Sequence, residues 1–280
     1  MIHQTTNTRC LIKAARNLGL RVEIFDKNGN FVMVREGEKK LFFANYATPF
    51  NSASVEKICK DKEFTHLLLE SVVRMPRAKG FFDPLYNEGG EIKNGRDTLA
   101  SLTQKIMESF TLPLILKPNS RARGLNVALC IESRHVYDAL ERIFDHRSEY
   151  YDYVALAEEY VKIDKEYRVV VYDKKIALLY EKDISGAEFN GNLSPLHWDG
   201  AKAVIIEDEN LKKKLAEFIS PIFDQFELNF AGLDIIIGKD SKIYLLEVNT
   251  QIGFANFVKD NGEKPLIEFY EKIFKPTLYE

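Results

Sequence analysis

The stretch Gly232-Leu-Asp-Ile-Ile-Ile-Gly-Lys-Asp-Ser-Lys-Ile-Tyr-Leu-Leu-Glu-Val-Asn249 predicts two β-strands joined by a tight turn. The turn, Gly238 to Lys242, consists of residues that tolerate tight backbone angles. Side chains two apart in a strand point to the same face, so Glu247 and Asn249 share a face. A hairpin closed at this turn can bring Asp234 beside them. The hairpin therefore gathers two carboxylates and one amide on one patch.

Such a patch has two interpretations. Oxygen ligands suit Mg²⁺, which keeps several waters and binds through one or two carboxylates plus substrate phosphates. Acidic residues at strand ends are, on the other hand, often simply solvated. Asp234 and Glu247 interrupt strongly apolar runs, where an unpaired charge is costly. The stretch alone leaves both open: a metal site of Asp234, Glu247 and Asn249, or solvated acids.

The composition is that of an ordinary soluble globular protein. The chain has 280 residues, enough for more than one domain, with 45% hydrophobic and 29% charged residues. A formal net charge of -3 implies no broad attraction to nucleic acid or to anionic membranes. The N-terminus has no apolar signal core, and no apolar run approaches the roughly 20 residues that span a bilayer. Cys10, Cys59 and Cys130 are scattered and odd in number, which indicates reduced thiols and a cytoplasmic protein.

A second feature is a buried strand that leads into a basic loop. The apolar run Leu114-Ile-Leu116 delivers Lys117, the polar loop Asn119 to Gly124 follows, and a strand from Leu125 to Ile131 returns. Backbone N–H groups in such a loop can bind an anion, and Lys117 adds a point charge. The alternative is a plain hairpin with a solvated loop, because the sequence does not match G-x-x-x-x-G-K-[ST].

Other segments show their class but not their chemistry. The first 50 residues predict one helix and a small meander of strands. A helix capped by Asp97 is expected to run to about Phe110, and one amphipathic helix to run from Leu211 to Phe226. Residues 184–199 form a long loop, and long loops are either functional lids or disorder.

Residues from about 55 to 274 resemble the ATP-grasp superfamily. Its members include D-alanine–D-alanine ligases, RimK-like and glutathione-synthetase-like enzymes, and the ATP-grasp half of cyanophycin synthetases. The resemblance lies in the order and spacing of several short motifs rather than in one of them. These are Asp61-Lys62, Pro76-Arg-Ala-Lys-Gly80, Lys117-Pro118, Glu159-Tyr-Val-Lys162, and the Asp234 to Asn249 hairpin.

The resemblance implies an α+β ATP-grasp fold, in which two α+β subdomains grip ATP, preceded by a small N-terminal α/β unit. The expected boundaries are residues 1–50 for this unit, 51–110 for a helical segment leading into the grasp, 111–162 for the small subdomain, and 163–280 for the large subdomain with the metal site.

The resemblance also assigns residues to ATP. Lys62 and Lys117 would reach the phosphates, and Ser120 to Gly124 would be the flexible loop that closes over them. Glu166 would hold the ribose hydroxyls. The adenine would lie at a hinge formed by Glu159, Tyr160, Val161 and Lys162.

The metal and catalytic residues follow from the same resemblance. Asp234, Glu247 and Asn249 match a triad that binds Mg²⁺, with Mn²⁺ as the alternative. Some ligases carry an arginine two residues before the metal aspartate, where this chain has Gly232, so Arg168 or Lys182 would take the charge of the acyl phosphate. The loop also departs from the family in being poor in glycine and carrying basic residues. Those residues are Arg121 and Arg123, and weaker candidates to face the acceptor are Tyr180, Asn190 and His197.

The implied activity is that of an ADP-forming ligase that joins a carboxylate to an amine through an acyl phosphate. The substrate would be an amino acid or short peptide, with no nucleic acid or membrane involved. One alternative is a peptide- or protein-modifying ligase, by RimK-like tailing or by macrocycle formation on a ribosomal peptide. Others are a non-catalytic nucleotide-binding module and a plain α/β protein. The short N-terminal unit suggests a compact acceptor site, a partner subunit, or a homodimer that completes the site.

Overall fold

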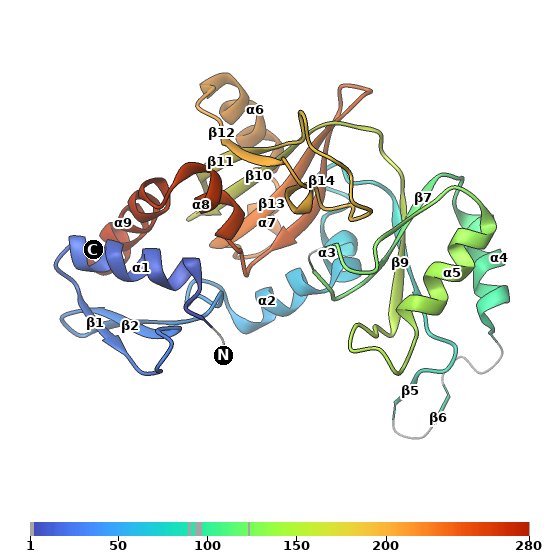
Figure 1. Ribbon diagram of the computed structural model, residues 1–280, viewed down its shortest axis with the longest axis horizontal. Helices are drawn as coiled ribbons and strands as arrows, with labels where there is room; N and C mark the ends of the chain where they lie inside the picture. The colour runs from blue at the N-terminus through green and yellow to red at the C-terminus, as the bar shows by residue number, and fades with distance from the viewer. Residues whose placement is uncertain (1–2, 89–90, 93–96, 123, 280) are drawn as a thin grey trace.

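The computed structural model describes residues 3–88, 91–92, 97–122 and 124–279 (Figure 1). Its largest sheet is antiparallel and has the strand order β12-β11-β10-β13-β14. The five strands are β10 (Ile163–Tyr172), β11 (Lys175–Asp183), β12 (Lys202–Ile205), β13 (Phe230–Gly238) and β14 (Ile243–Asn249).

The predicted hairpin is confirmed as β13 and β14. Asp234 lies directly opposite Glu247, and Gly232 lies opposite Asn249. The turn closes through a hydrogen bond of 2.9 Å from the backbone N–H of Gly238 to the carbonyl of Lys242. Nearly all of β13 is buried, because it lies in the middle of the sheet between β10 and β14.

A second sheet has the order β4-β9-β7-β8, and two helices cover it (Figure 1). β8 begins at Ala128, three residues later than expected, because 124–127 still belong to the loop. This sheet and its helices are called the small subdomain below, and they include β4 and α4 from the segment 51–110, which was expected to lie outside it. The elements are β4 (Ala78–Phe82), α4 (Leu99–Ser109), β7 (Leu114–Pro118), β8 (Ala128–Cys130), α5 (Ser133–Ile143) and β9 (Val154–Glu159).

The N-terminal unit packs on the far side of the large sheet from this small subdomain (Figure 1). It consists of α1 (Thr6–Asn17) and the antiparallel sheet β1 (Arg21–Ile24), β2 (Phe31–Glu36) and β3 (Lys39–Ala44). α1 lies along the C-terminal helix α9 (Lys264–Tyr279), and one apolar core joins this unit to α9 and to α8 (Ala255–Asn261).

Two short helices connect the N-terminal unit to the small subdomain (Figure 1). They are α2 (Ala53–Lys60) and α3 (Lys62–Leu69). Asp61 caps α3, since its side chain accepts a hydrogen bond of 2.9 Å from the backbone N–H of Phe64. This cap fixes Lys62 as the first residue of α3, facing the end of β14.

The structure corrects two expectations about helices. The segment expected as one helix from Leu211 to Phe226 is two, α6 (Glu209–Ile219) and α7 (Ile222–Gln225), because Pro221 interrupts the hydrogen-bond ladder. The cap of α4 is Thr98, not Asp97. Thr98 forms a reciprocal capping box with Ser101, which leaves Asp97 free to pair with Lys105.

The α+β class is confirmed, since the sheets are antiparallel and their strands come in runs separated by helices. The sequence-based expectation missed β12, α8 and the short 3₁₀ helix Pro195–His197 within the 184–199 loop. Among the described residues, no helix is both long enough and apolar enough to cross a bilayer.

Candidate active site

The predicted charged residues meet on one face of the large sheet. Asp234 on β13 lies opposite Arg168 on β10 and Glu247 on β14. Both oxygens of Asp234 bind the Arg168 guanidinium, at 2.7 Å from Nε and 3.0 Å from Nη2. Lys182 on β11 reaches across with its Nζ, 2.8 Å from Asp234 Oδ1 and 2.5 Å from Glu166 Oε1. This group of five is called the strand cluster below.

A glycine makes the arginine pair possible. A Cβ atom at Gly232 would lie 2.9 Å from Cδ and 3.0 Å from Nη1 of Arg168. Gly232 therefore leaves room for Arg168 to cross from the neighbouring strand.

Neighbouring cations keep two of the three acids of the strand cluster ionised, whereas burial raises the pKa of the third, Glu166. Burial alone would raise the pKa of Asp234, but Arg168 and Lys182 outweigh it and hold the pKa below its ordinary range. Burial would likewise raise the pKa of Glu247, and Lys62 and Lys117 lower it. Both carboxylates are therefore ionised at neutral pH, which is what metal or phosphate chemistry requires of them.

Lys62 connects the strand cluster to the small subdomain. Its Nζ lies 3.0 Å from Glu247 Oε1. The same ammonium donates to the carbonyls of Asn119 at 3.3 Å and Arg121 at 2.5 Å, in the loop after β7. Lys62, which is predicted to bind phosphates, therefore contacts both Glu247 on β14 and the loop after β7. The phosphates are expected to lie between these two segments.

Lys117 and Ser120 have partners that the sequence did not reveal. Lys117 is 8% exposed, and its Nζ lies 2.7 Å from Glu158 Oε2 on β9. The backbone N–H and the hydroxyl of Ser120 both donate to Asp152, each at 2.7 Å. Glu158 lies opposite Ile115, so it is on the same face of the sheet as Lys117, two residues further along β7. This contact between Glu158 and Lys117 can be predicted only once the pairing of β7 with β9 is known.

The loop from Asn119 to Gly124 meets the 184–199 loop. Gly124 has a φ of +68°, and a Cβ there would collide with the side chains of Asn192 and Ser194. The long loop is tied to α8 by the bond of 2.9 Å from Asn256 Nδ2 to the carbonyl of Leu196. The predicted lid therefore lies against the predicted phosphate loop. It also contains Asn190 and His197, and Asn190 Nδ2 donates to the backbone carbonyl of His197 at 2.7 Å, while Arg123 lies outside the described residues.

The predicted hinge crosses from one sheet to the other. Glu159 ends β9, and residues 160–162 lead directly into β10. The backbone N–H of Glu159 donates to the carbonyl of Arg77 at 2.8 Å, and Lys239 donates its N–H to the carbonyl of Lys162 at 2.8 Å. Tyr160 is 38% exposed, and Val161 is half-buried.

Comparison with known proteins identifies the family. The family model described as a RimK-like ATP-grasp domain matches residues 88–273, about two thirds of the chain. The chain belongs to the RimK-like ATP-grasp family. A comparison with curated proteins found no significant match.

Solved structures share the ATP-grasp fold at low sequence identity. D-alanine–D-alanine ligase from Bacillus anthracis complexed with ATP is 18% identical, with a TM-score of 0.50, over 78% of this chain and 68% of that one. A bifunctional glutathione synthetase from Pasteurella multocida is 14% identical, with a TM-score of 0.55, over 96% and 44%. N5-carboxyaminoimidazole synthase from Aspergillus clavatus, in complex with ADP and a ribonucleotide, is 15% identical, with a TM-score of 0.51, over 71% and 46%. This ATP-grasp chain therefore spans between 44% and 68% of their lengths.

The oxygen donors of this ATP-grasp chain fit a hard cation in kind. Two carboxylates and the amide of Asn249 face the same patch, and Asn249 Nδ2 lies 3.4 Å from Asp234 Oδ2. Among the described residues, no three His, Cys, Asp or Glu side chains are grouped to hold a metal, so further ligands would come from water or phosphate. Arg168 and Lys182 are bound to Asp234, and Lys62 is bound to Glu247, so these three side chains place positive charge beside the oxygen donors. Glu247, whose side chain is 26% exposed, is the more open donor.

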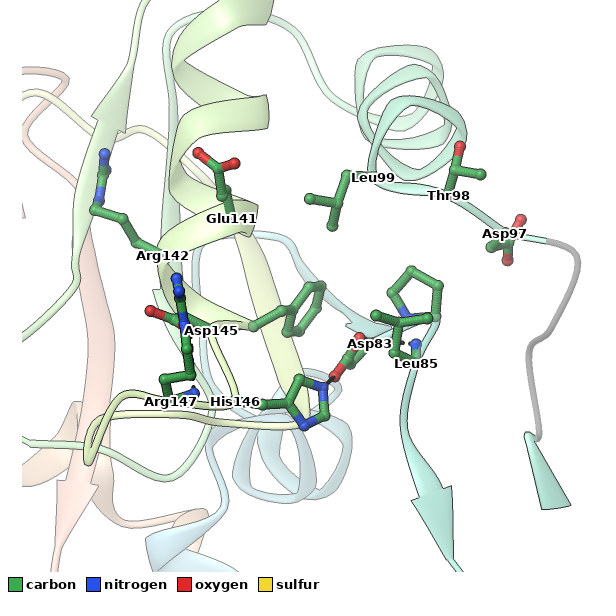
Figure 2. Close-up of a pocket in the computed structure, with 12 residues that line it drawn as sticks. Asp83, Leu85, Asp97, Thr98, Leu99, Glu141, Arg142, Asp145, His146 and Arg147 are labelled. Atoms are coloured by element: carbon green, nitrogen blue, oxygen red, sulfur yellow. Dashed lines mark hydrogen bonds and ion pairs between the residues drawn. The ribbon is translucent and has the colours of Figure 1, made fainter. Parts of the chain in front are cut away.

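Two hollows lie outside the strand cluster. One of about 690 Å³ lies beyond the end of β14, between the N-terminal unit and Gln251. Its lining is mostly neutral and polar: His3, Gln4, Thr5, Thr6, Asn45, Tyr46 and Gln251, with three alanines. The other, of about 880 Å³, lies in the small subdomain between α4 and α5 (Figure 2).

Proposed function

We propose that the protein is an ATP-dependent ligase that joins a carboxylate to an amine and releases ADP and phosphate. The observation that carries this proposal is the strand cluster, in which ionised Asp234 and Glu247 face cations from the large sheet and from α3. A chain of the ATP-grasp family that had lost catalysis would have no reason to keep these acids within an apolar sheet.

The chemistry follows from the leaving group. A carboxylate does not react with an amine at neutral pH, because hydroxide is a poor leaving group. Transfer of the γ-phosphoryl group to the carboxylate gives an acyl phosphate, and attack by the amine then expels phosphate. Phosphoryl transfer needs in-line positioning and positive charge more than covalent participation by the protein.

The residues divide this work. Lys62 and Lys117 would bind the phosphates of ATP, with the loop from Ser120 to Gly124 closing over them. Arg168 and Lys182 would stabilise the acyl phosphate and the oxyanion formed by the amine's attack. Asp234 fixes the positions of both side chains, because its carboxylate binds each of them within 2.8 Å.

The nucleotide base would lie at Glu159, Tyr160, Val161 and Lys162, where the chain passes between the sheets. The predicted ribose contact of Glu166 requires a rearrangement, because this carboxylate is 8% exposed and bonded to Lys182. A Mg²⁺ or Mn²⁺ ion held by Asp234, Glu247 and Asn249 would supply positive charge to the phosphate oxygens.

A second candidate, a peptide- or protein-modifying ligase, gains support from the 690 Å³ hollow. It begins two residues beyond Asn249, and its lining carries no Asp, Glu, Lys or Arg. A free amino acid has both a carboxylate and an ammonium to bind, whereas a peptide segment presents neutral amides. We infer that this hollow holds a neutral polar part of the acceptor.

The test follows ADP and phosphate release by purified protein with ATP and Mg²⁺, against pools of amino acids and of dipeptides. Release that depends on one pool, and that is lost in Glu247→Gln, supports the ligase and begins to identify its substrate. Nucleotide binding without turnover on either pool points to a larger peptide or protein acceptor. Folded protein that binds no nucleotide contradicts the proposal.

A further inference from the structure

The 880 Å³ hollow of the small subdomain is separate from the residues assigned above to ATP, metal and acceptor. Figure 2 shows Leu99 on the upper side of it, Asp83 and Leu85 on the lower side, and His146 beside Asp83. Pro84 and Phe144 complete the apolar part of the lining. A concave, largely apolar hollow with a few convergent polar groups is the usual form of a small-molecule site.

The floor of this hollow is a buried carboxylate. Asp83 is 2% exposed. Its Oδ1 accepts from the backbone N–H of Leu85 at 2.9 Å, and its Oδ2 accepts from the Tyr151 hydroxyl at 3.0 Å and lies 2.7 Å from His146 Nε2. An ionised carboxylate can accept about four hydrogen bonds. The described residues fill three of these, and one position on Oδ1 remains.

The charges around the hollow favour a cation. Four carboxylates line it, against two guanidiniums and one imidazole. Arg147 is bound to Asp145 at 3.1 Å and Lys105 to Asp97 at 2.6 Å, so among the described residues Asp83 and Glu141 are the lining carboxylates without a lysine or arginine partner. Figure 2 shows Arg142 extending away from Leu99 and Leu85. An anion would meet the buried charge of Asp83, whereas an ammonium would be attracted by it. The carboxylates belong to Asp83, Asp97, Glu141 and Asp145.

The floor also supports the phosphate loop from behind. Tyr151, which donates its hydroxyl to Asp83, accepts a hydrogen bond of 2.5 Å from Arg121 Nη2 at its carbonyl. The next residue, Asp152, binds the backbone and the hydroxyl of Ser120. Residues 151 and 152 therefore lie between the hollow and the loop, with bonds to both.

We propose that this hollow is an effector site for a small organic ammonium with an apolar body, and that its occupancy changes nucleotide affinity through Tyr151 and the phosphate loop. The ammonium would donate to Asp83, and the apolar body would pack on Leu85, Leu99 and Phe144. Binding itself is independent of the proposed function, whereas the coupling to nucleotide rests on it.

The first experiment measures binding by NMR with three probes of similar shape. They are 2-phenylethylammonium, neutral 2-phenylethanol and anionic 3-phenylpropionate. We expect saturable binding of the ammonium alone, at about 1 mM, which is ordinary for a ligand of this size. Equal binding of the alcohol, tighter binding of the carboxylate, or no binding up to about 10 mM would each overturn the proposal.

Two variants locate the probe. Asp83→Asn removes the charge and should weaken ammonium binding about ten-fold or more. Leu85→Lys brings a like charge to a wall position that is 67% exposed, so it should abolish binding without a cost in folding. The matched control is Asp138→Asn, on the exposed face of α5, where the carboxylate pairs with Arg134 outside the hollow. Unchanged binding in Leu85→Lys contradicts the assigned site.

The second experiment measures the coupling. Saturating 2-phenylethylammonium should change the Kd for ATP by about three-fold or more, and ATP should change the Kd of the probe by the same factor, because coupling is reciprocal. Probe binding with an unchanged ATP affinity contradicts the coupling alone. Probe binding by protein that binds no ATP would show that the proposed function has failed while the site has not.

Discussion

The large sheet holds its charged groups within strands, whereas the small subdomain holds the proposed phosphate loop, Ser120 to Gly124, by a few bonds at its base. Arg168, Lys182 and Asp234 lie on three adjacent strands; Lys182 and Asp234 are buried, and the Arg168 side chain is 15% exposed. Ser120 and Arg121 are fixed from outside the loop, by Asp152 and Tyr151. The backbone positions of the first group cannot shift without breaking the sheet, while the loop can open at the cost of a few hydrogen bonds.

This difference suits a reaction that must admit ATP and then surround it. Lys62 is the one side chain described here as bonded to both parts, to Glu247 of the sheet and to the carbonyls of Asn119 and Arg121. We expect changes in the strand cluster to affect folding and catalysis together. Changes at the loop base should affect nucleotide affinity with little loss of stability.

The largest effect should come from Asp234→Ala. It leaves Arg168 and Lys182 buried without their shared carboxylate, so we expect the free energy of unfolding to fall by about 3–5 kcal/mol. Urea titration followed by circular dichroism measures it. The matched control is Asp164→Ala, which removes an exposed ion pair with Lys239 and should cost less than about 1 kcal/mol. Equal costs would show that the strand cluster is not the rigid part.

Lowering the pH should also reduce the stability that the strand cluster provides, by less than Asp234→Ala does. The pKa values of Asp234 and Glu247 lie below their ordinary 3.8 and 4.5, because burial, which raises them, is outweighed by neighbouring cations. A carboxyl whose pKa is depressed by folding contributes stability that is fully present above the unfolded pKa and is lost as pH falls through the folded one. Stability should thus decline from pH near 4.5 downward. In Asp234→Asn this decline should shrink, and an unchanged acid profile would contradict the assignment.

Gly232→Ala should have the next largest effect. The added Cβ meets Arg168 Cδ at 2.9 Å, so the guanidinium must move away from Asp234, at a cost of about 1–3 kcal/mol in unfolding free energy. The turnover rate should fall by a larger factor than the folding equilibrium constant does, because the displaced group is the proposed catalytic arginine. Gly253→Ala is the control, since its nearest neighbour, Tyr46 Cε1, would be 3.8 Å away. Wild-type turnover in Gly232→Ala would remove Arg168 from the mechanism.

The parts that sequence predicted are those fixed by local patterns. The β13–β14 hairpin, with Asp234 opposite Glu247, follows from strand alternation and turn chemistry. Arg168 and Lys182 were reached only through resemblance to a family, because their meeting depends on the register of β10 and β11. Glu158 and Asp152 were missed for the same reason, since each faces its partner only after β7 and β9 pair.

The 880 Å³ hollow was beyond prediction altogether. Its lining comes from the start of α4, the end of α5 and the segment after β4, and the angle between these elements decides whether a space remains. The acids Asp234 and Glu247 of the strand cluster could be predicted from the sequence pattern itself. The cations Arg168 and Lys182 could not. The acids Asp234 and Glu247 interrupt apolar runs in one hairpin, whereas the cations come from several elements.

The smallest effect should come from Ser120→Ala. It removes the hydroxyl bond of 2.7 Å to Asp152 and leaves the backbone N–H bond of the same length in place. We expect a loss of about 0.5–1.5 kcal/mol in unfolding free energy at most. The Kd for ATP should rise several-fold, since the loop loses half of its anchor, while Asp152→Asn should weaken it further. Isothermal titration with ATP measures this rise. A loss of stability as large as that of Gly232→Ala would mean that the loop base is as rigid as the sheet, and the contrast between the two parts would not hold.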